Sequence, residues 1–359
     1  MKEKLKVGIV GGTGYVGQRF VTLLENHPWF SCTAIAASPR SAGKTYEEAV
    51  QSRWKLTEKM PEYVKNICVY SIQDLDAFCH GLDFVFCAVD MPKEEIRELE
   101  ERIAKMEIPV FSNNSAHRWT EDVPMMIPEI NSEHAMLIDV QRKRLGTQKG
   151  FIAVKPNCSI QSYVPALTPL MKFVPDRISV CTYQAISGAG KTFQDWPEMD
   201  QNLIPYIGGE EEKSEKEPLK IWGKIQNERI ELAALPVISA QCYRVAVQEG
   251  HTAAVSVSFQ KKPAAEEIID LWKNYKGDIH NLNLPNAPVP FLQYFTENDR
   301  PQPKLDAMYK NGMGVSISRL REDPVFDYKF TCLSHNTLRG AAGGALLTAE
   351  FVYKKGYLE

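Results

Sequence analysis

The chain has 359 residues, enough for two domains with separate cores, and 44% of its residues are hydrophobic and 24% charged. Its formal net charge of −3 offers no basic surface for nucleic acid or for an anionic membrane. No stretch approaches the roughly 18 apolar residues of a membrane span and the first residues lack a signal-peptide pattern, so we expect a cytoplasmic protein.

Strand-like and helix-like segments alternate over about the first 115 residues. The strand-like segments are 6–11, 31–38, 83–89 and 108–114, and the helix-like ones are 17–28 and 92–106. Alternation of this kind predicts an α/β fold with a doubly wound, parallel sheet of the Rossmann type.

A glycine turn separates the first strand from the first helix. The stretch "GGTGYVGQ" contains Gly12-x-Gly14-x-x-Gly17, which lets the backbone approach a pyrophosphate at the helix N-terminus. A glycine turn without a ligand is the alternative. An NAD site needs an acidic residue about 20 positions later, but the second strand ends in "AASPRSAGK", with Ser38 and Arg40. A hydroxyl and a guanidinium suit a 2′-phosphate, so the sequence favours NADP.

The pattern of predicted elements changes from about residue 150. Strand-like segments predominate at 151–157, 177–187, 251–260, 314–322 and 328–335. Residues 264–275 have helical spacing, so this half predicts an α+β domain with a mixed or antiparallel sheet. The glycine-rich helical segment 336–356 could return to the first domain. We therefore predict an NADP-binding domain at 1–157, completed by 337–359, and a catalytic and dimerisation domain at 158–336.

Eight cysteines occur without a CxxC pair or zinc-like spacing, so no metal site is predicted. Scattered free thiols suit a reducing compartment. Cys158, in "VKPNCSI", lies where a strand gives way to a helix. Backbone N–H groups and the dipole at a helix start favour the reactive thiolate. A small buried residue at an element boundary is the alternative.

A nucleophilic cysteine needs a histidine that exchanges protons. His251, in "CYRVAVQEGHTAAVSV", lies where a turn meets a strand, seven residues after Arg244, so both side chains could enter one cleft. His117 and His335 are alternatives. A nicotinamide site with a cysteine nucleophile indicates oxidation of an aldehyde to a thioester, which a second nucleophile cleaves, or the reverse reduction of an activated acyl group.

Seven colinear stretches resemble aspartate-semialdehyde dehydrogenases over essentially the full chain, most closely the archaeal and fungal branch. They are "GGTGYVGQ", "SNNSAHR", "PNCS", "QAISGAGK", "PYIGGEEEK", "YRVAVQEGH" and "HNTLRGAAGG". The resemblance implies reversible, NADP-dependent reductive dephosphorylation of L-4-aspartyl phosphate to L-aspartate 4-semialdehyde. That reaction serves the biosynthesis of lysine, methionine, threonine and isoleucine. The resemblance also implies a homodimer or homotetramer.

Roles for individual residues follow from the resemblance. Cys158 would be the nucleophile, His251 the general acid/base, and Gln184 would orient the substrate. Arg244 would pair with the substrate α-carboxylate and Glu210 with its ammonium group. Phosphate would be bound by Arg118 and Lys213, with Asn157 nearby. Contacts with NADP would come from Gly11, Thr13, Gly14, Tyr15, Val16, Ser38, Arg40, Ser41, Ser187, Gly188 and Asn336.

Several alternatives stay open at this point. The run "GGEEEKSEKE" (208–217) could be a solvated helix start, and Glu211 or Glu212 could replace Glu210. A malonyl-CoA reductase, from a related group, would share the cysteine but need no ammonium site, and it typically carries another residue in place of Asn157. A nucleotide-sensing scaffold would be expected to lack Cys158, the histidine or the arginine. Glyceraldehyde-type dehydrogenases use a substrate without an amine.

Overall fold

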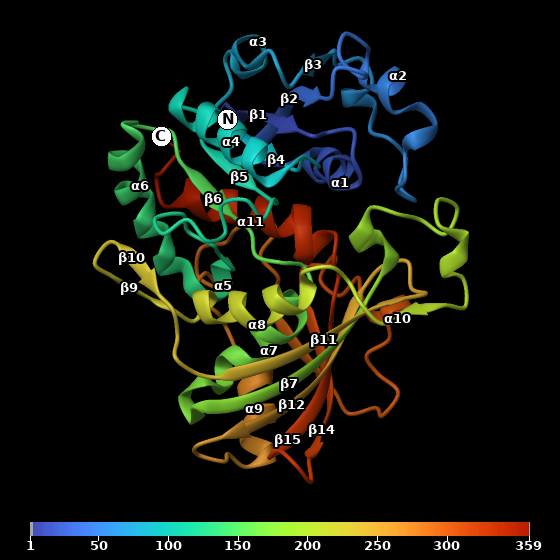
Figure 1. Ribbon diagram of the computed structural model, residues 1–359, viewed down its shortest axis with the longest axis vertical. Helices are drawn as coiled ribbons and strands as arrows, with labels where there is room; N and C mark the ends of the chain where they lie inside the picture. Colours follow the sequence, from blue (N-terminus) through green and yellow to red (C-terminus); the bar gives the residue numbers. More distant parts are fainter. Residues whose placement is uncertain (1–2, 359) are drawn as a thin grey trace.

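The first of two large sheets is parallel and six-stranded in the computed structural model, which describes residues 3–358 (Figure 1). Its strand order is β3 (Val69–Ser71), β2 (Phe30–Ala37), β1 (Leu5–Val10), β4 (Phe84–Cys87), β5 (Val110–Ser112), β6 (Ile152–Val154). The predicted Rossmann-type sheet is thus confirmed, although the three-residue β3 was not predicted. The order reverses between β1 and β4, where such sheets open a ligand crevice.

Helices cover both faces of this sheet because its central strands are apolar throughout, as in the fully buried "FVFC" of β4. The helices are α1 (Tyr15–Leu24), α2 (Tyr46–Val50), α3 (Leu75–Cys79), α4 (Lys93–Lys105), α5 (Pro128–Asn131) and α6 (Leu137–Leu145). Short 3-10 turns occur at η1 (Gln51–Arg53), η2 (Glu62–Val64), η3 (Ser132–Met136), η4 (Thr168–Phe173), η5 (Ile186–Ala189) and η6 (Pro197–Met199).

The second sheet is mixed and seven-stranded, as predicted for an α+β domain. Its order is β13 (Leu292–Phe295), β14 (Val315–Glu322), β15 (Tyr328–Ser334), β12 (His251–Phe259), β7 (Pro175–Gln184), β11 (Val237–Val245), β8 (Leu203–Ile204). A separate hairpin joins β9 (Lys224–Gln226) to β10 (Arg229–Glu231). Strand β12 runs antiparallel to β7 and β15, whereas β11 runs parallel to β7.

One face of the second sheet is covered and the other is open. Helices α7 (Ile160–Leu167) and α9 (Ala265–Asn274) pack on the covered face, and buried residues alternate with exposed ones along β11. On the open side Val237 is 64% exposed and Tyr183 38%. The remaining helices of this half are α8 (Glu210–Ile221) and α10 (Pro303–Asp306).

The last helix returns to the first sheet and lies between the two sheets (Figure 1). It is α11 (Gly343–Lys354), preceded by the wide turn η7 (Leu338–Ala342). Leu346 and Phe351 share a core with Val7 and Phe20, in line with the predicted return. The exact domain boundaries, 1–157 with 337–359 and 158–336, stay a prediction.

Strand register brings the ends of three strands of the second sheet together. Gln184 ends β7 directly opposite Arg244 of β11, and His251 begins β12 opposite Ser334 of β15. In residues 3–358 no helix is long and apolar enough to cross a membrane. The same residues contain no group of three histidine, cysteine, aspartate or glutamate side chains that could hold a metal ion.

Candidate active site

Cys158 lies in the connection between β6 and α7, where it faces the strand ends of the second sheet. Its Sγ is 3.5 Å from Nε2 of His251, so the structure brings the predicted pair together. The other two candidate histidines lie elsewhere. His117 hydrogen-bonds to Thr120, and His335 pairs with Glu249.

The hydrogen bonds of His251 define which of its ring nitrogens carries the proton. Nδ1 accepts a hydrogen bond of 3.0 Å from the backbone N–H of Ala185. The proton of the neutral ring must then be on Nε2, which faces the sulfur. Burial, followed by the positive charge of Arg244, holds the pKa of His251 well below its usual value. His251 is therefore a neutral hydrogen-bond donor toward Cys158.

Ala185 also positions the predicted carboxylate-binding arginine. Its carbonyl oxygen accepts a hydrogen bond of 2.7 Å from Nη1 of Arg244, the one hydrogen bond that this side chain makes within residues 3–358. Arg244 is only 6% exposed, so its remaining donors face the site without a protein acceptor. A β-carbon at Gly188 would lie 2.8 Å from Nη1 of Arg244 and 3.1 Å from the ring of His251. A side chain at this position would displace the guanidinium of Arg244 or the ring of His251.

Glu210 is the one acid of the 210–212 run that enters the site. It begins α8 and is 8% exposed, and it accepts hydrogen bonds from Asn157 (3.0 Å) and Gln184 (3.3 Å). Lys213 forms an ion pair with it at 2.7 Å. Burial alone would raise the pKa of Glu210, but Lys213 and the amide donors outweigh it and lower the pKa. Glu211 instead accepts from the backbone of Cys242.

A second buried acid on α8, Glu217, binds Arg118 and the backbone of Asn157 next to the cysteine. Its Oε1 pairs with Arg118 at 2.8 Å, and its Oε2 accepts the backbone N–H of Asn157 at 2.7 Å. The Asn157 side chain in turn accepts the N–H of Ser159 at 2.8 Å. Arg118 is thereby fixed beside the turn that carries Cys158, although its cation already has a partner.

The ionisation of Cys158 is decided by opposing effects. Burial raises the pKa of the thiol, and the negative charge of Glu210 adds to the rise. Lys155, Arg244 and Arg118 act in the other direction but do not cancel it. In the free structure, burial thus outweighs the lowering of the thiol pKa that was expected from the helix start.

The turn between β1 and α1 has the features of a phosphate site. Helix α1 begins after Gly14 without a side-chain cap, which leaves backbone N–H groups available to an anion. Gly11 has φ +84°, and a β-carbon there would lie 2.4 Å from the carbonyl oxygen of Ala88. Ser38 and Arg40 lie exposed after β2.

Asn336 and Ser187, both expected to contact the cofactor, are linked to the second sheet. Nδ2 of Asn336 donates to Oγ of Ser187 at 2.8 Å, and its Oδ1 accepts the N–H of Gly250 at 2.8 Å. Gly250 precedes His251, so residues expected to contact the cofactor are linked by hydrogen bonds to the strand that carries the histidine.

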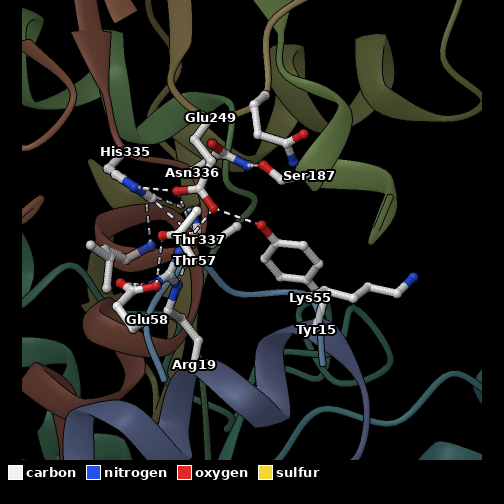
Figure 2. Close-up of polar contacts among 12 residues, drawn as sticks. Tyr15, Arg19, Lys55, Thr57, Glu58, Ser187, Glu249, His335, Asn336 and Thr337 are labelled. Carbon is white, nitrogen blue, oxygen red and sulfur yellow. Dashed lines mark hydrogen bonds and ion pairs between the residues drawn. The ribbon is translucent and has the colours of Figure 1, made fainter. Parts of the chain in front are cut away.

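A cluster of charged and polar side chains lies next to this link, between α1 and the second sheet (Figure 2). Glu249 pairs with His335 and accepts from Arg19 (2.9 Å) and Tyr15 (2.7 Å), both on α1. Arg19 also pairs with Glu58 at 2.5 Å. A cavity of about 940 Å³ opens beside these residues. The cluster joins helix α1 to the start of β12.

Comparison with known proteins places this geometry in a family. Residues 6–138 match the family described as semialdehyde dehydrogenase, NAD binding domain, and residues 167–339 match the semialdehyde dehydrogenase dimerisation domain. The chain is 41% identical to an aspartate-semialdehyde dehydrogenase of Archaeoglobus fulgidus, covering 98% of this chain and 99% of the relative. The chain belongs to the aspartate-semialdehyde dehydrogenase family.

Other members of the family agree with that assignment. The enzyme of Saccharomyces cerevisiae is 39% identical, and the match covers 100% of both chains. The crystal structure of aspartate semialdehyde dehydrogenase with NADP from Candida albicans superposes with a TM-score of 0.88 at 36% identity, covering 99% of this chain and 100% of that one.

Three of the side chains that organise the site in this family member were not predicted. Glu217 lies seven residues after Glu210, a helical spacing that places both on one face of α8 and could have identified it. Lys155 precedes the cysteine by three residues in an otherwise apolar stretch. Glu249 had no local signal, because its partners are more than 80 residues away in the chain.

We expect Glu249→Gln to lower the free energy of unfolding by about 3 kcal/mol near neutral pH. Burial would raise the pKa of Glu249, but His335 and Arg19 outweigh it and lower the pKa from 4.5 to about 2. A carboxylate with a lowered pKa stabilises the fold above its unfolded-state pKa and loses that contribution as pH falls through its folded pKa. The difference between the variant and native proteins should therefore shrink as pH falls below 4.5 and disappear only near pH 2. Urea unfolding at several pH values measures the difference.

Glu58→Gln is the matched control, because it removes the other acid bound to Arg19. The Glu58 side chain is 49% exposed, so we expect a loss below about 1 kcal/mol. A Glu249→Gln deficit that stayed constant with pH would contradict the electrostatic account.

Proposed function

We propose that this chain catalyses the NADP-dependent and phosphate-dependent oxidation of L-aspartate 4-semialdehyde to L-4-aspartyl phosphate, and the reverse reduction. The observation that carries the proposal is the pairing of Cys158 with His251, with Arg244 and Glu210 placed around them in a member of this family. A thiol with cationic and anionic neighbours suits an aldehyde that carries a carboxylate and an amine.

The residues present fit NADP as the cofactor. The uncapped start of α1 and the missing β-carbon at Gly11 leave room and donors for a pyrophosphate. Ser38 and Arg40 would hold the 2′-phosphate, with Ser41 beside them. The other residues proposed to contact NADP are Thr13, Gly14, Tyr15, Val16, Ser187, Gly188 and Asn336. When bound, NADP supplies the acceptor for the hydride that the substrate carbon loses.

The protein's own groups carry the covalent steps. The Cys158 thiolate bonds to the aldehyde carbon, and the carbonyl oxygen becomes an oxyanion that accepts from Nε2–H of His251. After the hydride has left, a thioester remains on Cys158. A phosphate oxygen then bonds to the carbonyl carbon, the carbon–sulfur bond breaks, and the electron pair returns to sulfur. Proton exchange at Nε2 by His251 requires the Ala185 hydrogen bond to open.

Recognition of the substrate would use the groups around the cysteine. Arg244 has donors free for the α-carboxylate, and Glu210, oriented by Gln184 and Asn157, would accept the ammonium group. The two cations proposed to bind phosphate each have an acidic partner already, so phosphate would bind beside two existing ion pairs. Those pairs are Arg118 with Glu217 and Lys213 with Glu210.

A CoA-thioester reductase of the malonyl-CoA type is not favoured. The Glu210 carboxylate, oriented by the side-chain N–H groups of Asn157, is a buried acceptor for an ammonium group, which malonyl-CoA lacks. Both relatives and the solved structure described above carry the aspartate-semialdehyde dehydrogenase name.

We also propose a cytoplasmic homodimer or homotetramer. The dimerisation-domain match at 167–339 supports an oligomer, and the open face of the second sheet, with Tyr183 and Val237 exposed, offers a surface for a second copy. All eight cysteines are free thiols, which suits a reducing compartment.

The test is the reduction of NADP by L-aspartate 4-semialdehyde with and without phosphate. We expect absorbance at the NADPH wavelength to rise only when phosphate is present. Oxidation of NADPH by malonyl-CoA, with no response to the semialdehyde, would overturn the proposed substrate.

Arg40→Glu should reverse the cofactor preference. A carboxylate repels a 2′-phosphate and can accept from a 2′-hydroxyl, so we expect kcat/KM for NADP to fall about 100-fold relative to that for NAD. Steady-state kinetics with both cofactors measure the ratio. Arg102→Glu is the control, because Arg102 lies exposed on α4 and is not among the residues proposed to contact NADP. A similar change in both variants would assign the effect to general charge.

A further inference from the structure

Glu249 is an acid two residues before His251, and the steps proposed above give it no role. Two elements that are distant in the chain hold its carboxylate (Figure 2). From α1, the Tyr15 hydroxyl donates to Oε1 at 2.7 Å and Nη2 of Arg19 donates to it at 2.9 Å. From the segment after β15, His335 pairs with Oε2. The side chain is 19% exposed, so the carboxylate is fixed from both sides at the end of the turn that leads into β12.

The backbone of the same turn, between β11 and β12, is also held. The carbonyl oxygen of Val247 accepts the N–H of Ile186 at 2.9 Å. The carbonyl oxygen of Gln248 accepts the N–H of Ser187 at 3.2 Å. These two donors directly follow Ala185, whose own N–H determines the tautomer of the catalytic histidine. The turn therefore holds the segment that orients the ring as well as the strand that carries it.

Gly250 joins Glu249 to His251 with little freedom to move. Its φ is +98°, in the region that favours glycine. A β-carbon there would lie 3.1 Å from Cβ of Pro303 and 3.2 Å from Cβ of Ala307. Because this single, closely packed residue separates the two side chains, a shift of the Glu249 carboxylate would be passed on to the start of β12.

The contact that depends on this placement is the one of 3.5 Å between Nε2 of His251 and Sγ of Cys158. A donor at this point stabilises the thiolate relative to the thiol, and a hydrogen bond weakens steeply as its geometry departs from the optimum. Within residues 3–358 the other hydrogen bond of the ring is the one from the Ala185 N–H. The direction of Nε2–H is therefore set by the backbone around the ring, which Glu249 helps to fix.

We propose that Glu249 and Tyr15 are positioning residues for His251. The carboxylate, held from α1 by the Tyr15 hydroxyl, fixes the 247–250 turn so that Nε2–H of His251 points at the sulfur of Cys158. Tyr15 is also the first residue of α1, next to the glycine turn proposed to bind the cofactor pyrophosphate. One hydroxyl thus ties the proposed cofactor turn to the catalytic histidine.

Alkylation of Cys158 by iodoacetamide in the free enzyme tests the proposal with Tyr15→Phe, which removes one hydroxyl and no charge. Only the thiolate reacts, so below the midpoint of the titration the rate follows the thiolate population. With His251 displaced the thiolate loses a donor, and we expect the rate between about pH 7 and 9 to fall about threefold. A variant that only loosened the fold would expose the buried thiol and react faster. Mass spectrometry of the Cys158 peptide separates this thiol from the other seven cysteines.

His251→Gln shows the route of the effect. If the Tyr15 hydroxyl acts through the histidine, adding Tyr15→Phe to His251→Gln should leave the alkylation rate unchanged. A further fall of about threefold in that background would mean that the hydroxyl reaches the thiol by another route, and the proposal would be wrong.

Tyr63→Phe is the matched control, because the Tyr63 hydroxyl also bonds to α1, at the carbonyl oxygen of Val21 (2.7 Å), rather than to Glu249. Its alkylation rate should equal the native one. Glu249→Gln repeats the test if Tyr15→Phe does not fold. Loss of the negative charge alone favours the thiolate and speeds the reaction, so a slower rate assigns the effect to position. A faster rate in Glu249→Gln, or a native rate in Tyr15→Phe, would overturn the proposal.

The expected effect on turnover rests on the proposed function, whereas the alkylation rates need no substrate. Tyr15→Phe should lower kcat about fivefold at saturating NADP. The KM for L-aspartate 4-semialdehyde should stay within about twofold, because Arg244 and Glu210 are held by other groups. Slower alkylation without phosphate-dependent activity would retain the positioning and reject the substrate. Full activity with unchanged alkylation would retain the function and reject the positioning.

Discussion

Replacing Cys158 with alanine is expected to abolish phosphate-dependent NADP reduction, with a fall in kcat of at least about 10⁴-fold. Without sulfur no thioester forms, and neither His251 nor Arg244 can replace the covalent step. NADP binding should persist, because the proposed cofactor contacts lie at the start of α1 and on the 187–188 turn. Fluorescence quenching by NADP together with the steady-state assay measures both properties.

Cys68→Ala is the matched control, since Cys68 is an exposed free thiol. It should retain native activity. If Cys158→Ala were as active as Cys68→Ala, Cys158 would be only a buried residue at the β6–α7 boundary, and the thioester mechanism would be wrong.

Arg244→Lys should raise KM for L-aspartate 4-semialdehyde by about 100-fold, equivalent to about 3 kcal/mol. The guanidinium donates from Nη1 to the Ala185 carbonyl oxygen, while its other donors remain available to a carboxylate. A lysine ammonium lacks this planar geometry and cannot form the same two contacts at once. The KM for phosphate should change much less.

A substrate without the carboxylate gives the internal control. With 3-aminopropanal, native protein and Arg244→Lys should have similar kcat/KM values, because the lost interaction does not exist for that aldehyde. Arg102→Lys, on the exposed side of α4, should match the native protein with both aldehydes. An equal loss on both substrates would mean that Arg244 only supports the fold.

The local parts of this architecture could be predicted from the sequence. The glycine turn, the apolar strand β4 and the position of Cys158 between a strand and a helix each depend on a few neighbouring residues, and the structure has all three. The turn–strand position favoured His251, with Arg244 seven residues before it, over the other histidines, and the resemblance gave both residues their roles, although they are distant from Cys158 in sequence. Strand register then places them at one end of the second sheet.

What could not be predicted depends on packing over long distances. Sequence showed three adjacent acids, but only the rotation of α8 against the site selects Glu210 over Glu211. It showed a helix start at Cys158 but not the burial that raises the pKa of the thiol. The contacts of Glu249 join α1 to the 249–251 turn and residue 335, and no short pattern encodes such a junction.

The return of α11 has a consequence for how the chain folds during synthesis. Leu346 and Phe351 complete the core that contains Val7 and Phe20, yet the ribosome makes them after the whole second sheet. Until then the nascent first sheet exposes the apolar surface that this helix covers. The first half is therefore expected to remain incompletely folded and accessible to chaperones until α11 has been synthesised. A ribosome-bound chain ending before residue 337 should be sensitive to protease in its first half.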